Sequence, residues 1–446
     1  MAETTTVTAT GDNNIDGLLI GVKWASPSVS FRFTDSIDDY ESDYPDRAIH
    51  AVSFQMLNTT QRAVALRWIG TGGEYYNVSN LSPFELTDAS DRDATIPIAM
   101  SDVLGIISTD TAYTYSPANP VQAGDVWFNT TLYNNPVVGN YAYYTFGHEL
   151  GHALGLKHGH QTGGVSNVAM NSDRDSMEFS IMTYRSYVGA PTNGVSNETW
   201  GYAQSLMMYD IAAIQQMYGA WFGYNSDNTN YTFSTTTGEM FVDGVGQGTP
   251  GDNRIFRTIW DGDGIDTYDF SNYTTNLAID LTAGGWSDLD VGGNFQRASL
   301  GNDHYARAQV FNALQYNGDV RSLIENANGG SGNDTISGNS ANNLLTGNGG
   351  MDTLVGGFGN DSLTGGAGAD TFVFNSLSEG IDTITDFAYW DVDKIQVSAS
   401  GFGIGVGDYN KFSFESYTGS LYFDGTQFAS IQLYSGFIPS FDINIV

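Results

Sequence analysis

Hydrophobic and polar positions follow two different patterns along the chain, and the change comes after residue 218. Between residues 46 and 68, apolar side chains recur at helical spacing, at Ile49, Val52, Met56 and Ala63. This spacing predicts one long helix, and short apolar runs predict strands near residues 29–33, 95–100 and 125–128. Later segments are short and punctuated by glycine and aspartate, which predicts strands. We therefore expect an α+β protein with two domains, at residues 17–222 and 223–446.

Five consecutive nonapeptides are the most regular part of the second domain. They run from Gly329 to Val373 and read GGSGNDTIS, GNSANNLLT, GNGGMDTLV, GGFGNDSLT and GGAGADTFV. This is the period of the calcium-binding pattern GGxGxDxUx, in which glycine turns present carbonyl oxygens and the aspartate supplies a carboxylate. The eighth residue of each repeat is apolar, namely Ile336, Leu345, Leu354, Leu363 and Phe372. We expect these side chains to stack as the interior of a parallel β-roll.

The repeats also supply candidate calcium ligands, because calcium prefers carboxylate and carbonyl oxygens. These are Gly330, Gly332, Asp334, Gly347, Asn348, Gly350, Asp352, Gly356, Gly357, Gly359, Asp361, Gly365, Gly366, Gly368 and Asp370. Asn348 replaces a glycine, which a carbonyl ligand tolerates. The second repeat has Asn343 where aspartate is expected and Ser340-Ala341 in the turn, which counts against a calcium site there. A flexible glycine-rich linker is the alternative, but it predicts neither a strict period nor an apolar eighth position.

Charge and composition restrict the classes of partner. Fifty acidic residues against sixteen basic ones give a formal net charge of −34, which repels nucleic acid and anionic membranes and favours calcium. No apolar stretch approaches the roughly 18 residues of a membrane span, so we expect no membrane insertion. The chain has no cysteine, which excludes disulfides. Residues 1–16 are polar, lack the pattern of a signal peptide and form a candidate short pro-segment.

Eleven residues, HELGHALGLKH from His148 to His158, carry the candidate chemistry of the first domain. On a helix, His148 and His152 project from the same face, one turn apart, as two ligands of one zinc ion. Glu149 follows directly, where its carboxylate can reach a water bound to that ion and act as general base. Gly155 can end the helix and let the chain bring His158 back as third ligand. Only six histidines occur in the chain, so this clustering favours a metal site over unrelated core histidines.

A second segment, Ser180-Ile181-Met182-Thr183-Tyr184, follows about thirty residues after the motif. Together the two segments resemble the serralysins, which are metzincin zinc peptidases with a methionine turn. The resemblance implies that Met182 packs under the three histidines. It also implies that Tyr184 ligates zinc through its phenolic oxygen and then stabilises the tetrahedral intermediate. Matrix metalloproteinases share the motif, but they place tyrosine directly after the methionine and use a cysteine for latency.

The resemblance to serralysins extends over most of the chain. Residues 200–218 look like the helix that closes the catalytic domain, and WDGDGIDT at 260–267 and IENA at 324–327 look like a further calcium loop. The calcium ligands implied outside the repeats are Asp261, Asp263, Gly264, Asp266, Glu325 and Asp382, and Asp263 stands where relatives usually have a smaller residue. The final residues, Phe441–Val446, are similar to the uncleaved signal that bacterial type I exporters recognise.

The resemblance implies a metzincin domain with a twisted mixed sheet and long helices, followed by a parallel β-roll or β-sandwich domain. It implies one zinc ion and several calcium ions in a secreted, monomeric endopeptidase that acts on extracellular proteins or peptides, with a bacterial type I exporter and a dedicated proteinaceous inhibitor as partners. One alternative is a calcium-dependent adhesin or surface-layer protein with a vestigial zinc site, although such a protein needs no Glu149. Another is a matrixin-like metzincin, which the repeats and the position of Tyr184 disfavour.

Overall fold

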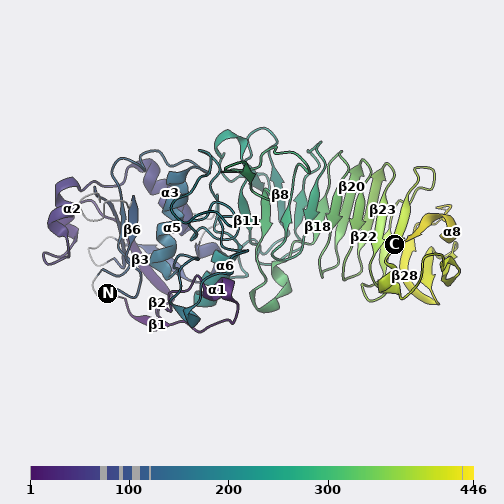
Figure 1. Ribbon diagram of the computed structural model, residues 1–446, viewed down its shortest axis with the longest axis horizontal. Coiled ribbons are helices and arrows are strands. Elements are labelled where there is room, and N and C mark those ends of the chain that lie inside the picture. The colour runs from purple at the N-terminus through teal and green to yellow at the C-terminus, as the bar shows by residue number, and fades with distance from the viewer. Residues whose placement is uncertain (1, 71–77, 90–93, 103–110, 120–121, 434) are drawn as a thin grey trace. The chain divides into compact units, whose positions relative to one another are not determined.

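A computed structural model describes residues 2–70, 78–89, 94–102, 111–119, 122–433 and 435–446. The chain divides into two compact units (Figure 1). The first unit comprises Met1–Tyr224, Gln247–Trp260 and Arg297–Arg307, and the second comprises Asn225–Gly246, Asp261–Gln296 and Ala308–Val446. Helices and a mixed sheet make up the first unit, whereas strands dominate the second, as the sequence predicts.

The first unit is built on a five-stranded sheet with the order β4-β3-β5-β7-β6. Its strands are β3 (Ser28–Phe33), β4 (Glu85–Asp88), β5 (Ile96–Met100), β6 (Ala112–Thr114) and β7 (Val126–Phe128). Four of them are parallel, and β6 pairs antiparallel with β7 at the end of the order. The strands expected near residues 29–33, 95–100 and 125–128 are confirmed. All three residues of β7 are buried, which explains its continuous apolar run.

Helix α5 (Tyr141–Leu154) carries the histidine motif through the core of the first unit. Asn140 caps its start by accepting a hydrogen bond from the Tyr143 N–H, and Gly155 ends it with a φ of +114°. Helix α3 (Thr59–Ile69) packs against α5 at Gly147, where a Cβ atom would lie 2.7 Å from the Trp68 ring. The unit also contains the helices α1 (Asn13–Asp16), α4 (Val78–Leu81) and α6 (Met208–Tyr218). Its other strands are the antiparallel pair β1 (Thr4–Thr6) and β2 (Val22–Trp24), the antiparallel pair β15 (Ser299–Gly301) and β16 (His304–Tyr305), and the short strand β11 (Arg257–Ile259).

The prediction of one long helix over residues 46–68 is wrong. The chain forms two helices there, α2 (Arg47–Ser53) and α3, separated by an extended segment. Within that segment Gln55 exchanges two backbone hydrogen bonds of 3.0 Å with Met100, a residue distant in sequence. Asn58 and Gln61 then start α3 as a capping box. Similarly, the helix expected over residues 200–218 begins only at Met208.

The second unit contains two stacks of parallel strands, and successive strands of the repeats alternate between them. One stack is the centre of an eleven-stranded sheet and consists of β8 (Asn230–Phe233), β12 (Thr267–Asp269), β18 (Asn326–Asn328), β20 (Leu344–Gly349), β22 (Ser362–Ala367), β24 (Asp382–Ile384) and β28 (Thr426–Ile431). The other consists of β13 (Ala278–Asp280), β19 (Thr335–Ser337), β21 (Thr353–Val355), β23 (Thr371–Phe374), β25 (Lys394–Val397) and β29 (Ile443–Ile445).

Smaller elements flank these stacks. The larger sheet is extended at its ends by the antiparallel strands β9 (Met240–Val242), β10 (Val245–Gly246), β26 (Phe412–Glu415) and β27 (Ser420–Phe423). The remaining described strands and α-helices of this unit are β14 (Trp286–Ser287), β17 (Val310–Asn312), α7 (Ala399–Phe402) and α8 (Pro439–Asp442).

The register of the parallel strands places the apolar eighth residues of the repeats directly above one another. Ile336 pairs with Leu354 and Leu354 with Phe372 in one sheet, while Leu345 pairs with Leu363 in the other. All five side chains are fully buried. Two repeats therefore make one complete turn of a parallel β-roll, and the predicted apolar interior is confirmed.

Candidate metal centre

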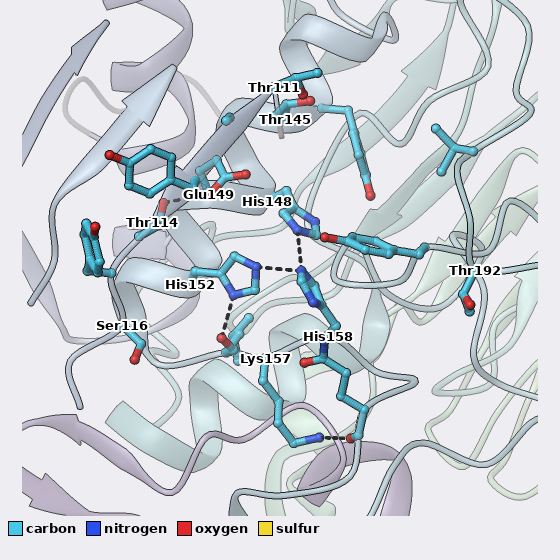
Figure 2. A pocket seen from close by; sticks show the side chains of 18 of the residues that line it. Thr111, Thr114, Ser116, Thr145, His148, Glu149, His152, Lys157, His158 and Thr192 are labelled. Atoms are coloured by element: carbon cyan, nitrogen blue, oxygen red, sulfur yellow. Dashed lines mark hydrogen bonds between the residues drawn. The ribbon is translucent and has the colours of Figure 1, made fainter. Parts of the chain in front are cut away.

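Three histidine nitrogens converge at the C-terminal end of α5 (Figure 2). The Nε2 atom of His158 lies 3.2 Å from Nε2 of His148 and 2.9 Å from Nε2 of His152. All three donor atoms lie within 4.8 Å of one another. The helical spacing positions the first two rings, and the turn at Gly155 returns the third.

The opposite nitrogens of two rings fix the orientation of the cluster. Nδ1–H of His148 donates to the Ile181 carbonyl at 2.7 Å, and Nδ1–H of His152 donates to the Leu156 carbonyl at 2.9 Å. These bonds leave each Nε2 unprotonated and directed at the centre. Burial lowers the pKa of His148 to about 3 and that of His152 to about 4, and burial with the neighbouring histidines lowers the pKa of His158 as well. Three neutral imidazoles suit a zinc ion.

Met182 packs against α5 at Gly151, between the two helical histidines in sequence. Its side chain is fully buried, and a Cβ atom added at Gly151 would lie 2.7 Å from its sulfur. The glycine between the two helical histidines is therefore needed for the close approach of the methionine turn.

Asp210, a residue of α6 that sequence reasoning missed, holds the methionine turn in place. Its carboxylate accepts hydrogen bonds from Ser180 Oγ at 2.6 Å, from the Ile181 N–H at 2.7 Å and from the Met207 N–H at 2.9 Å. Burial raises the pKa of Asp210 to about 6. The only signal in the sequence was that Asp210, in the first turn, is the one charged residue of this helix.

The histidines open into a cavity of about 690 Å³. Its lining includes the edge strand β6 and the following residues up to Ser116. Glu149 is buried in the wall, and its Oε2 atom accepts a hydrogen bond of 2.8 Å from Thr114 Oγ1 on β6 (Figure 2). Sequence reasoning missed Thr114, because its contact with Glu149 spans two elements that are separated along the chain.

Tyr184 lines the same cavity and is 38% exposed. Its ring centroid lies 4.3 Å from that of His158 and 6.1 Å from that of His148. The ring of His160 lies 5.2 Å from Tyr184 and 5.7 Å from His158, although the sequence suggested no role for it. The expected zinc ligands, Glu149 and Tyr184 are thus gathered around one cavity.

The expected calcium ligands lie in the second unit, where two columns of acidic residues precede the parallel strands. One column contains Asp334, Asp352, Asp370 and Asp393, and the other contains Asp266, Glu325, Asp361 and Asp382. All eight side chains are buried. Within a column, a backbone N–H donates to the carboxylate one turn further on, as from Asp334 to Asp352 at 2.8 Å and from Asp352 to Asp370 at 2.9 Å.

Several of these carboxylates have an oxygen without a partner. Oδ2 of Asp266, Asp352, Asp361 and Asp370 is buried and accepts no hydrogen bond from any residue that the structure describes. A Cβ atom added at Gly347, Gly356 or Gly365 would lie 2.2–2.3 Å from the Oδ2 atom of the aspartate in the same repeat, so each glycine keeps the space beside that oxygen open. Buried acceptors without donors fit an oxygen-binding cation.

The same burial raises the pKa values of the carboxyl groups in the two columns. They are about 6 for Asp334, Asp352 and Asp361, about 7 for Asp370, Asp382 and Glu325, and about 9 for Asp266. In the loop before β12, burial also raises the pKa of Asp261 to about 7. Asp263 in that loop is only half-buried, and its Oδ1 accepts from the Gly264 N–H at 3.1 Å.

Comparison with known proteins identifies relatives over most of the chain. Residues 222–433 match a family model described as the C-terminal part of serralysin peptidases of group M10. Serralysin G of Dickeya chrysanthemi is 35% identical over 84% of this chain and 73% of its own length, and serralysin A of the same organism is 35% identical over 94% and 83%. Metalloprotease AprA of Pseudomonas entomophila is 40% identical over 63% of this chain and 56% of its own length.

Among the described helices, none has both the length and the apolar character needed to cross a lipid bilayer. The histidine centre, the two-unit fold and the extent of these matches lead to one assignment. The chain belongs to the serralysin family of metalloproteases.

Proposed function

We propose that this chain is a secreted zinc endopeptidase that uses Glu149 as its general base. The observation that carries the proposal is the convergence of three histidine Nε2 atoms, two of them held unprotonated by hydrogen bonds at Nδ1, beside a buried carboxylate in one cavity. Zinc, when bound by His148, His152 and His158, supplies a Lewis acid that polarises the scissile carbonyl and lowers the pKa of water. Protein and peptide substrates follow from the family assignment.

Glu149 would accept a proton from the attacking water at its carboxylate and pass it to the leaving amine. Its position in the cavity wall, with Oε2 held by Thr114 Oγ1 at 2.8 Å, supports this role. The hydrogen bond restricts the rotation of the carboxylate, which favours one productive orientation.

The edge strand β6 supports an extended peptide as substrate. It lies at the end of the strand order among the described residues, and residues 111–116 line the cavity that contains the histidines. An extended peptide can add to such an edge through main-chain hydrogen bonds. An internal peptide bond would then pass the metal centre, as an endopeptidase requires.

Tyr184 would contribute its hydroxyl group as a further zinc ligand in the resting enzyme and as a donor to the carbonyl oxygen during hydrolysis. Its location beside His158 on the cavity wall supports this assignment. Removing one such donor typically lowers turnover by about 10²–10³. Met182 would keep its structural role under the histidines.

The second domain, for which we propose residues 223–446, would bind several calcium ions through the acidic columns. Oxygens without donors and glycines that leave room beside them support this proposal. Calcium-dependent folding would keep this domain unfolded in calcium-poor cytosol and fold it outside the cell. We further propose export by a bacterial type I exporter that recognises Phe441–Val446, a monomeric enzyme, and regulation by a proteinaceous inhibitor.

Digestion of unfolded casein in millimolar calcium, with the products sequenced by mass spectrometry, tests the proposal. We expect new internal termini, loss of cleavage after zinc is removed with a chelator, and recovery when zinc is restored. A zinc-loaded chain that leaves casein intact would contradict the proposal and favour a calcium-dependent adhesin or surface-layer protein.

A further inference from the structure

Asn343 occupies the place of an aspartate in the larger sheet's column. Its backbone N–H makes the same contact as the Asp361 N–H in that column. The Asn343 N–H donates to Oδ1 of Asp361 at 2.7 Å, just as the Asp361 N–H donates to Oδ1 of Asp382 at 3.0 Å. The Asn343 N–H therefore continues the hydrogen bonding of the column, although Asn339 and Ala341 lack the positive φ of their counterparts in the fourth repeat, Gly357 and Gly359.

The side chain of Asn343 is 2% exposed, and its amide is fully paired. Its Nδ2 group donates to the carbonyl oxygen of Glu325 at 2.7 Å and to Oδ1 of Asn339 at 3.1 Å. Its Oδ1 atom accepts from the Asn339 N–H at 2.8 Å. The contrast with Asp361 is direct, because its Oδ2 atom is buried and has no donor among the described residues.

Asn339, four residues earlier in the same turn, completes the arrangement. Its buried Nδ2 group donates to the carbonyl oxygens of Leu281 at 3.0 Å and Ile324 at 2.7 Å. Its Oδ1 atom accepts from the Ala341 N–H at 2.9 Å. Two neighbouring amides thus supply N–H donors to three backbone carbonyl oxygens, which are atoms of the kind that calcium prefers as ligands.

We propose that the turn from Gly338 to Asn343 binds no calcium, because the amides of Asn339 and Asn343 take the place of the ion. Amide hydrogens satisfy the buried carbonyl oxygens, and a neutral side chain adds no negative charge that a cation would have to balance. The inference rests on the calcium-binding role proposed above for the other turns. It predicts that calcium is needed on either side of this turn but not within it.

Counting bound calcium in the full chain tests the inference. Wild type, Asn343→Ala and Asp361→Asn are dialysed against the same millimolar calcium, and calcium per chain is measured by elemental analysis. We expect Asn343→Ala to bind as many ions as wild type and Asp361→Asn to bind fewer. Loss of an ion in Asn343→Ala would overturn the inference. An unchanged count in Asp361→Asn would instead overturn the calcium role of the columns.

A crystal structure of the wild-type chain grown in calcium gives an answer even if a variant fails to fold. Anomalous difference density identifies calcium directly. We expect density beside Oδ2 of Asp361 and none at coordination distance, about 2.3–2.6 Å, from Oδ1 of Asn343. An ion at Asn343 would overturn the inference.

Discussion

Glu149 is held between the helix that carries it and the edge strand of the sheet. The motif predicts its place beside His148, but not its hydrogen bond to Thr114, which joins two elements that meet only in the folded chain. A carboxylate that acts as general base must lie within reach of the proton that it abstracts, and it must also be held in the right orientation. Thr114 is therefore a positioning residue whose effect on catalysis can be separated from substrate binding.

Replacing Thr114 with valine keeps the shape of the side chain and removes its hydroxyl. A hydrogen bond to a charged group contributes about 1.5–3 kcal/mol, so we expect kcat to fall about 10- to 150-fold. KM should change little, because the backbone of β6 is retained. Steady-state kinetics on a peptide substrate at equal zinc content measures both constants. Thr114→Ser, which keeps the hydroxyl, should stay close to wild type, and equal kcat values for the valine variant and wild type would contradict the role.

The methionine turn connects helix α6 to the metal centre. Asp210 on α6 binds the Ile181 N–H, and the Ile181 carbonyl in turn accepts the Nδ1–H bond of His148. A change at Asp210 should therefore reach the zinc ligand through one intervening residue. The distance of Asp210 from the motif in sequence is the reason that spacing alone did not identify it.

Asp210→Asn removes one acceptor from a carboxylate that accepts three hydrogen bonds. We expect zinc affinity to fall about 10- to 100-fold, as is typical when a partner of a metal ligand is lost. Competition with a chromogenic chelator measures this affinity. Asp173→Asn, at an exposed carboxylate paired only with the adjacent Arg174 among the ion pairs of the described chain, is the matched control. Equal affinities for Asp210→Asn and the control would contradict the coupling.

Elements with a strict local signal were predicted correctly, and elements decided by distant contacts were not. Gly155 ends the zinc helix, and the apolar eighth residues form the interior of the roll, because short-range geometry determines both. The helix expected over residues 46–68 is broken because Gln55 pairs with Met100 in a different part of the chain. The hydrogen bonds of the Asn339 side-chain amide also could not be predicted, because their acceptors are carbonyl groups of other turns.

At the scale of the whole molecule, the formal net charge is −34, and some of the acidic residues that produce it are buried in the columns of the roll. Burial raises the pKa values of these aspartates to about 6–7, from 3.8 in the unfolded chain. Without calcium, the folded roll therefore binds more protons than the unfolded roll between pH 4 and 7. The stability that these aspartates contribute to the folded roll is fully present below their unfolded pKa, and it is lost as pH rises through their folded pKa values.

We accordingly expect the calcium-free roll to be more stable at pH 5 than at pH 8. Hydrogen exchange of peptides from β19 to β23 in EDTA, corrected for the intrinsic effect of pH, measures this difference within the full chain. Addition of millimolar calcium at pH 8 should restore protection, because the cation replaces the missing protons. Equal protection at both pH values without calcium would contradict the electrostatic explanation.

Substitution of Glu149 by glutamine tests the central claim most directly. Glutamine keeps the size of the side chain and an oxygen for Thr114, but it cannot accept a proton as a general base. We predict that Glu149→Gln binds zinc as wild type does and loses about 10²–10⁴ of kcat on unfolded casein in millimolar calcium. A zinc-loaded Glu149→Gln variant that retains wild-type turnover would contradict the mechanism.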